Sequence, residues 1–218
     1  GRLGWPVLQD ILLQLLDALA HSHARGVIHR DLKPGNVLVS GDGPDGALRA
    51  RLTDFGLAQA LDQHAGQDRT VAGTPAYMAP EQLQGDWRDQ GSWTDLYSLG
   101  CMAWALTTGS PPFGRKRAFA EFCQDHLHRP PPEFTPRVAV PLSFEGWLRR
   151  LLCKDPADRY TRAADAAEAL RTLSEAEMLP AVAEAAPGET MRLPGDTAYD
   201  DDASTGAPVG GPPDDVPD

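Results

Sequence analysis

The chain has 218 residues, of which 41% are hydrophobic and 23% are charged, a composition that suits one globular domain with its own core. It contains no apolar run long enough to cross a bilayer and no signal-peptide pattern, so we expect a cytoplasmic protein without a membrane segment. The net charge is −11, but residues 175–218 alone carry −10 and residues 1–174 only −1. A nearly neutral folded part gives no reason to expect a nucleic-acid partner.

An amphipathic helix is predicted first, across residues 7–26. Its apolar residues recur at i, i+3 and i+4 spacing, and Gly26 is a typical stop. The apolar positions are Val7, Leu8, Ile11, Leu12, Leu15, Leu16 and Leu19. The chain starts at Gly1 rather than at methionine, directly before this pattern, so we expect it to be part of a longer protein.

Three short β-rich runs come next, at residues 27–29, 36–40 and 50–54. The last two are separated by "GDGPDG", whose glycines, aspartates and proline are typical of turns. We therefore expect a small β-hairpin.

Residues 57–94 lack sustained periodicity and are expected to form an irregular loop, with one helical turn near 80–84. The segment 95–108 is apolar on nearly all sides, which predicts a helix buried in the centre of the core. Two further amphipathic helices are predicted over residues 143–155 and 161–173.

After residue 174 the periodic pattern ends. Residues 175–218 are rich in proline, glycine and acidic residues, so we expect a disordered acidic tail or linker, and we favour a solvated linker over a specific role. The predicted organisation is one folded unit at residues 1–174, followed by this tail.

Cysteines, tryptophans and histidines have simple structural interpretations. The cysteines show no zinc-ligand spacing and are expected to be buried, reduced thiols: Cys101, Cys123 and Cys153. Four tryptophans are expected to be core and helix-packing residues: Trp87, Trp93, Trp104 and Trp147. Four histidines are expected at the surface or partly packed: His21, His23, His126 and His128.

Five short motifs occur in one order along the chain. Each alone would be a weak signal, but their combined order and spacing are hard to obtain by chance. The motifs are "HRDLKPGNVLV" at 29–39, "LTDFGLA" at 52–58, "GTPAYMAPE" at 73–81, "DLYSLG" at 95–100 and "KDPADRY" at 154–160. Across residues 5–174 the chain resembles the protein kinase family, specifically the C-terminal lobe of the eukaryotic-type Ser/Thr kinases found in bacteria.

The resemblance implies a mainly helical fold (α+β class), built around the buried helix 95–108 with small β-hairpins at the edge of a cleft. A complete kinase also has an N-terminal lobe, with a Gly-rich loop, a strand lysine and a helix glutamate. That lobe is absent from this sequence, so we expect it to be a partner supplied by the longer protein.

The resemblance also implies a set of chemical roles. Asp31 would accept or orient the proton of the substrate hydroxyl, and Lys33 would place a positive charge beside the γ-phosphate of ATP. Asn36 and Asp54 would ligate Mg²⁺, with Mn²⁺ as another possible ion, because oxygen ligands suit hard cations. Leu38 would form the floor beneath the adenine.

Other matched residues would support the site. Asp95 would accept backbone N–H bonds from the loop that contains Asp31. Glu81 and Arg159 would form an ion pair. His29 and Phe55 would pack behind the site, a structural role that we favour for His29 over that of general base.

The resemblance further implies regulatory and specificity positions. Thr74 marks Ser/Thr rather than Tyr specificity. Arg30 can pair with a phosphate on the loop after residue 57, and Thr70 is the candidate acceptor, although an ordinary loop threonine is nearly as plausible from the sequence.

Two functions follow from the sequence. The first is ATP-dependent phosphorylation of Ser or Thr in protein substrates, with low activity for this segment alone. The alternative is a non-catalytic, kinase-like binding or regulatory module. The acidic and amide side chains of residues 31, 36 and 54 favour the enzyme, because a binding module has no need of all three.

Overall fold

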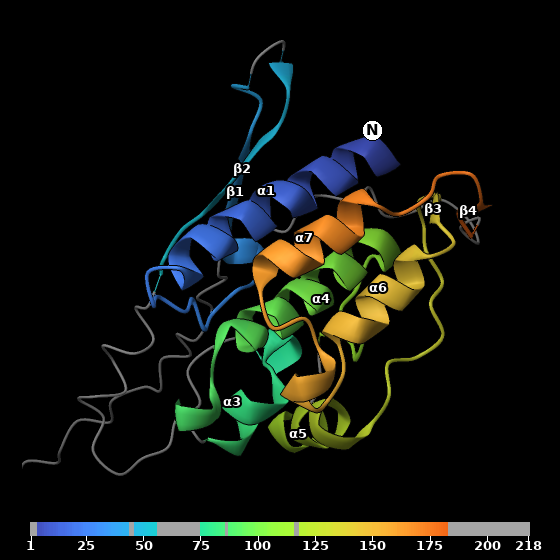
Figure 1. The fold of residues 1–218 in the computed structure, drawn as a ribbon. Coiled ribbons are helices and arrows are strands. Elements are labelled where there is room, and N and C mark those ends of the chain that lie inside the picture. Colours follow the sequence, from blue (N-terminus) through green and yellow to red (C-terminus); the bar gives the residue numbers. More distant parts are fainter. Residues whose placement is uncertain (1–3, 44–45, 56–74, 86, 116–117, 183–218) are drawn as a thin grey trace, which may run out of the picture.

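The computed structural model describes residues 4–43, 46–55, 75–85, 87–115 and 118–182, and it is mainly helical over these ranges (Figure 1). The α-helices are α1 (Trp5–His23), α3 (Pro80–Gln84), α4 (Ser92–Thr108), α5 (Phe119–His128), α6 (Phe144–Leu151) and α7 (Ala163–Arg171). The strands are β1 (Val37–Ser40), β2 (Arg49–Leu52), β3 (Val140–Pro141) and β4 (Met178–Leu179). Short 3₁₀ turns are η1 (Pro34–Asn36), η3 (Pro75–Tyr77), η4 (Trp87–Asp89) and η5 (Pro156–Asp158). Within the described ranges, no helix combines the length and apolar composition needed to span a membrane.

Helix α1 confirms the first predicted element. Pro6 lies in its first turn, where a missing N–H costs no hydrogen bond, and Gly26 follows its end with a φ of 74°. The apolar stripe is buried except for Val7, which is exposed, and it packs on α7, α4 and β2. Burial of this stripe therefore attaches α1 to the core and, through β2, to the hairpin.

Helix α4 is the central buried helix that the sequence predicts. It begins at Ser92, three residues before the predicted start, where the Thr94 hydroxyl accepts the backbone N–H of Gly91. Most of its residues are buried, and it contacts α1, α6, α7 and η3 (Figure 1). Gly100 allows α6 to approach closely, since a Cβ at this position would lie 2.8 Å from the Cβ of Leu151.

Strands β1 and β2 form the predicted hairpin, paired antiparallel from Val37 opposite Leu52 to Ser40 opposite Arg49. The hairpin lies along α1 and extends beyond it (Figure 1). The Gln14 side chain of α1 binds the backbone of β2, donating to the oxygen of residue 48 at 2.9 Å and accepting from the nitrogen of residue 50 at 2.9 Å. One glutamine thus fixes the hairpin to the helical body.

The predicted strand at residues 27–29 is wrong. These residues have no strand assignment, and the backbone N–H of His29 donates instead to the carboxylate of Asp95. A side chain from the core therefore takes the hydrogen bond that a neighbouring strand would have taken.

Helix α5 is not predicted by the sequence, because proline-rich segments flank its ten residues on both sides. Phe122 and His126 are buried and hold it against the rest of the domain. The expectation of a surface or partly packed His126 is wrong, since this ring is fully buried and its Nδ1 lies 2.9 Å from the hydroxyl oxygen of Tyr97.

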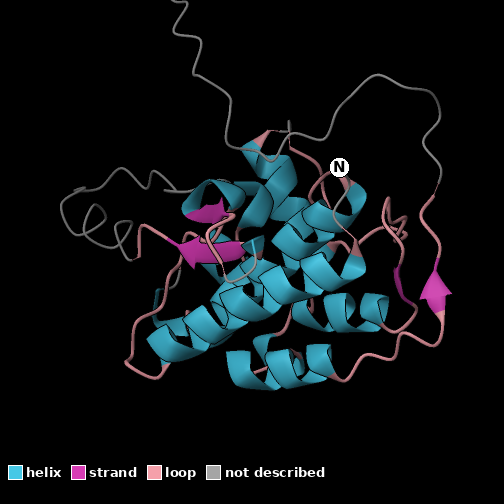
Figure 2. Ribbon diagram, turned by 90° about the horizontal axis from the view of Figure 1, so that it is seen from above, coloured by secondary structure: helices cyan, strands magenta, loops and turns pink. Residues whose placement is uncertain are grey.

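The predicted helices 143–155 and 161–173 correspond to α6 and α7, which are shorter at their ends. Beyond α7 the described chain continues to residue 182, and β4 pairs antiparallel with β3. Figure 2 shows that the two strand pairs lie apart from each other at the periphery of the helices. Residues 175–182 thus differ from the expected disorder of the tail, and residues 183–218 lie outside the described ranges.

The other structural expectations are met in part. Cys101 is buried as expected, Cys123 and Cys153 are half-buried, and all three thiols are free. Trp104 and Trp147 are buried in the core as expected. Trp87 is 64% exposed, which contradicts its predicted place in the core.

The close contact between α4 and α6 predicts the effect of one added methyl group. Gly100→Ala should lower the free energy of unfolding by about 1–3 kcal/mol, because the new Cβ would overlap the Cβ of Leu151. Urea denaturation measures this change. The control is Gly146→Ala in α6, where a Cβ would have no neighbour within 4 Å, and which should stabilise by about 0.5–1 kcal/mol. Equal effects of the two substitutions would contradict the packing described for α4.

The buried His126 predicts a pH dependence of stability. Burial lowers the pKa of His126 to about 3 from an ordinary value of 6.5, and the charge of Lys154 acts in the same direction. Between these values the unfolded chain binds a proton on this ring and the folded chain does not, so His126 makes stability rise with pH over the window from about 3 to 6.5. His126→Phe should remove this part of the slope, measured as the free energy of unfolding at several pH values. A slope that stays the same would show that the folded ring takes up the proton.

Candidate active site

The candidate site is centred on loop 29–36, which joins the end of α1 to β1. Asp95, fully buried in the first turn of α4, accepts the backbone N–H of His29 on Oδ2 and that of Arg30 on Oδ1, each at 2.8 Å. These are the bonds that the sequence predicts for Asp95. The Nε2 of His23 also lies 2.8 Å from Oδ2, a contact that the sequence does not predict.

His29 is buried behind the loop, and its hydrogen bonds define its tautomer. Its Nδ1 accepts the backbone N–H of Asp31 at 3.3 Å, so Nε2 carries the proton and donates to the backbone oxygen of Thr53 at 2.9 Å. Its ring lies against the ring of Phe55, with centroids 4.6 Å apart. Both ring nitrogens are therefore used in holding backbone, which supports a structural role for His29 rather than that of general base.

Two polar side chains meet at the carboxylate of Asp31. The Nζ of Lys33 lies 2.8 Å from Asp31 Oδ2, and the Nδ2 of Asn36 donates to the same oxygen at 3.1 Å. The Nδ2 of Asn36 also donates to the backbone oxygen of Asp31 at 2.8 Å. The loop thus presents a carboxylate with a cation and a buried amide each within hydrogen-bonding distance of it.

The hairpin holds the backbone directly before Asp54 against the loop. The backbone N–H of Thr53 donates to the oxygen of Asn36 at 3.0 Å, which continues the pairing of β1 and β2 by one residue. Asp54 is the next residue and is exposed. The side chains of Asn36 and Asp54 offer oxygen atoms, the ligand type that Mg²⁺ prefers.

Among the described residues, only two that are not glycine have a positive φ, and both belong to this site. Arg30 has a φ of 64° and Asp54 a φ of 59°. Such a conformation costs about 1–3 kcal/mol per residue and persists only where surrounding contacts maintain it. The strained backbone thus coincides with the two segments that carry the acidic and amide groups.

Leu38 lies on β1, directly after the loop. It is 58% exposed, and it pairs with Arg51 across the hairpin. A large apolar side chain is thus exposed on the hairpin, two residues after the polar loop in the sequence.

An ion pair between Glu81 and Arg159 is present, as the sequence predicts. The two side chains are buried and bidentate, with N–O distances of 2.9 and 3.0 Å. The Thr94 hydroxyl donates to Glu81 at 2.8 Å, and the guanidinium of Arg159 lies 4.8 Å from the ring centroid of Tyr97. Its N–H groups also donate to the backbone oxygens of Trp93, Cys153 and Lys154.

Gln82, which follows Glu81, contacts the loop and is not identified by the sequence motifs. Its Nε2 donates to the backbone oxygen of Arg30 at 2.6 Å. The only sequence signal is its position directly after the "APE" string. Thr70 and Thr74, the predicted regulatory and specificity residues, lie outside the described residues.

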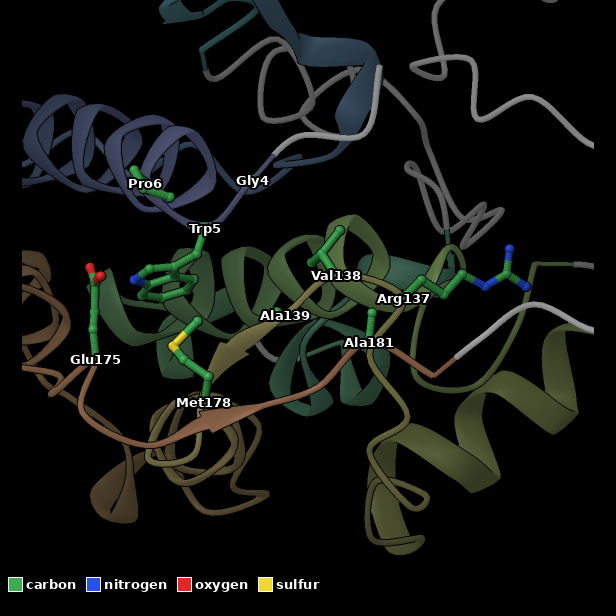
Figure 3. A pocket seen from close by; sticks show the side chains of 9 residues that line it. All are labelled: Gly4, Trp5, Pro6, Arg137, Val138, Ala139, Glu175, Met178 and Ala181. Carbon is green, nitrogen blue, oxygen red and sulfur yellow. The ribbon is translucent and has the colours of Figure 1, made fainter.

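A hollow of about 400 Å³ lies elsewhere, between the start of α1 and the β3–β4 pair (Figure 3). The side chains of Trp5, Val138 and Met178 are among those that line it. Its lining includes no residue of loop 29–36 and none of residues 52–55. The hollow is therefore separate from the candidate active site.

Comparison with known proteins gives matches over most of the chain. The family model for the protein kinase domain matches residues 3–172. The serine/threonine-protein kinase Pkn1 of Myxococcus xanthus is 41% identical over 165 residues, which cover 74% of this chain and 23% of that protein. PkaA of Streptomyces coelicolor is 43% identical over 173 residues, or 78% of this chain and 30% of that protein. PknF of Mycobacterium tuberculosis is 38% identical over 168 residues, which cover 76% of this chain and 34% of that protein. The chain thus spans between 23% and 34% of the length of these curated relatives.

The buried ion pair predicts a large loss of stability when one partner is removed. Arg159→Leu should lower the free energy of unfolding by about 3–5 kcal/mol, because Glu81 would remain buried without its counter-charge. Chemical denaturation measures the loss. The matched control is Arg162→Ala, which removes an ion pair with Asp165 at the surface, where the arginine side chain is 77% exposed, and which should change stability little. Similar losses in both variants would contradict the importance of burial.

Proposed function

Because the chain belongs to the protein kinase family, with bacterial serine/threonine-protein kinases among its relatives, we propose that the protein containing it transfers phosphate from ATP to Ser or Thr residues of protein substrates. The observation that carries this proposal is the meeting of Asp31, Lys33 and Asn36 in one loop. Phosphoryl transfer requires mainly positioning and charge stabilisation, and these three side chains supply both.

Each residue of the loop has a role in this proposal. Asp31 accepts a hydrogen bond from the substrate hydroxyl and orients it toward the phosphate. Lys33, already 2.8 Å from Asp31, has the charge to stabilise the negative charge of the transferring group. The amide nitrogen of Asn36 holds Asp31 in place through two hydrogen bonds.

The cofactor is proposed to be ATP with Mg²⁺, for which Mn²⁺ can substitute. Asn36 and Asp54 would hold the cation through their oxygen atoms, and the cation would neutralise charge on the phosphates. Among the described residues, no three His, Cys, Asp or Glu side chains cluster as a metal site of their own. This fits Mg²⁺, which usually combines one or two protein ligands with phosphate and water oxygens. The exposed Leu38 provides an apolar surface for the adenine.

The remaining phosphate contacts are proposed to come from an N-terminal lobe in the longer protein. The one string with GxGxxG spacing, "GDGPDG" at residues 41–46, follows loop 29–36 and connects β1 to β2 in the sequence, so it does not correspond to the Gly-rich loop of that lobe. The segment alone should therefore bind Mg·ATP weakly and transfer phosphate poorly. The alternative of a non-catalytic binding module gives no physical reason for a lysine and an amide to be held at the Asp31 carboxylate.

Regulation is proposed through the loop that follows Asp54. Thr70 is the candidate phosphate acceptor, and Arg30 the residue that would pair with the phosphate, since an added phosphate forms strong bonds with guanidinium groups. Thr74 is proposed to mark specificity for Ser/Thr. Phosphopeptide mapping of the active protein, together with Thr70→Ala, distinguishes this role from that of an ordinary loop threonine.

The proposed function is tested by Asp31→Asn in the longer protein. Phosphate transfer from ATP to a protein substrate should fall by about 10²–10⁴-fold, because an amide does not accept the hydroxyl proton. Transfer of labelled phosphate measures the rate. The control is Asp42→Asn, which alters an exposed aspartate paired with Arg51 on the hairpin and should leave the rate unchanged. Undiminished transfer by Asp31→Asn, or none by the unaltered protein, would reject the proposal.

A further inference from the structure

The peptide unit that joins Arg30 to Asp31 is held at both of its polar atoms by side chains. Its oxygen accepts the Nε2 of Gln82 at 2.6 Å, and its N–H donates to the Nδ1 of His29 at 3.3 Å. The preceding N–H, that of Arg30, donates to Asp95 at 2.8 Å. The backbone on the N-terminal side of Asp31 is therefore bonded to three side chains in succession.

Gln82 is the member of this set that comes from α3. Its Oε1 accepts the backbone N–H of Ala79 at 3.0 Å, which caps the first turn of α3, while its Nε2 reaches Arg30. Ala79 offers a donor and Arg30 an acceptor, so only one orientation of the amide satisfies both. The same side chain thus caps a helix and binds the loop.

Helix α3 is itself firmly placed. Glu81, the neighbour of Gln82, is held by the buried guanidinium of Arg159 and by the hydroxyl of Thr94 from α4. A continuous series of contacts therefore runs from the core through α3 to the oxygen of Arg30. That oxygen belongs to a residue with a φ of 64°, a conformation that needs such support.

We infer that Gln82 is a positioning residue for the proposed phosphate transfer: its amide fixes the peptide plane before Asp31 and thereby the direction of the Asp31 carboxylate. This inference rests on the proposed function and goes further by assigning a role to a residue outside the loop. Gln82 acts through Arg30 and has no contact of its own with the reacting groups.

Gln82→Glu separates the two tasks of the side chain. A carboxylate at this position still accepts the N–H of Ala79, and an acidic residue in the first turn suits the helix dipole. It has no proton to donate to the oxygen of Arg30. The cap of α3 should therefore keep its hydrogen bond, and the folded structure should lose only the small stability of the one bond to the loop. Gln82→Met removes both hydrogen bonds at similar volume, and Gln84→Glu on the exposed side of α3 is the matched control.

In the longer protein, Gln82→Glu should lower kcat roughly tenfold, the factor expected for one lost hydrogen bond that orients a reacting group. The KM for ATP should stay within about twofold, because the proposed ATP contacts lie on other residues. Amide hydrogen exchange should become faster across residues 29–36 and stay unchanged in α4. Gln84→Glu should match the unaltered protein in every measurement, and the urea midpoint of Gln82→Glu should fall less than that of Gln82→Met, which loses both hydrogen bonds.

Unchanged kcat and unchanged exchange in both Gln82 variants would overturn the inference. A fall in kcat that is matched by an equal fall in the fraction of folded protein would also overturn it, because Gln82 would then act only through folding. If the unaltered protein transfers no phosphate, the proposed function fails. In that case, the amide hydrogen exchange of residues 29–36 is the measurement that shows whether Gln82 holds the loop.

Discussion

The candidate active site depends on one buried carboxylate. Asp95 is a charged group inside the core, where an unpaired charge would be very costly, and the backbone N–H groups of His29 and Arg30 offset that cost. The same two hydrogen bonds fix the start of loop 29–36 relative to α4, the most buried helix among the described residues. The geometry of the polar loop is thus set by the apolar core beneath it, and changes in core packing will reach the site through Asp95.

A second set of contacts comes from nearby in the chain. Pairing of β1 with β2 places Thr53 beside Asn36, and the ring of His29 joins the loop to the backbone of Thr53. The hairpin thereby fixes the backbone before Asp54 to the loop, whereas α3 and α4 hold the loop through Gln82 and Asp95. The hairpin and the two helices thus support the loop independently. The strained backbone of Arg30 and Asp54 lies in the region that they support. Such a site keeps its shape before any ligand is bound, which reduces the cost of ordering it during binding.

Sequence patterns predict those parts of the structure that depend on short spacing. Periodicity locates α1, α4, α6 and α7, and the motif around Asp31 identifies the side chains that meet in the loop, because they lie within a few residues of one another. The contact of Gln82 with Arg30 joins residues 52 positions apart and leaves no periodic signal. Helix α5 is short and lies between prolines, and β4 has two residues whose strand pairing depends on β3. The run at 27–29 has the composition of a strand, but Asp95 takes the hydrogen bond of His29, and tertiary structure overrides local preference there.

The long sequence separation between the loop and Asp95 affects how the protein folds. The hairpin contacts are local and can form early, whereas the bonds to Asp95 close a separation of 65 and 66 residues, and the pair between Glu81 and Arg159 one of 78. Loops of this length close slowly, because the chain loses conformational entropy before the stabilising contact forms. On the ribosome, residues 29–36 emerge well before α4, and α4 well before Arg159. The loop therefore acquires its final shape only late in synthesis, so a partly made chain has the chemical groups of the site without their arrangement.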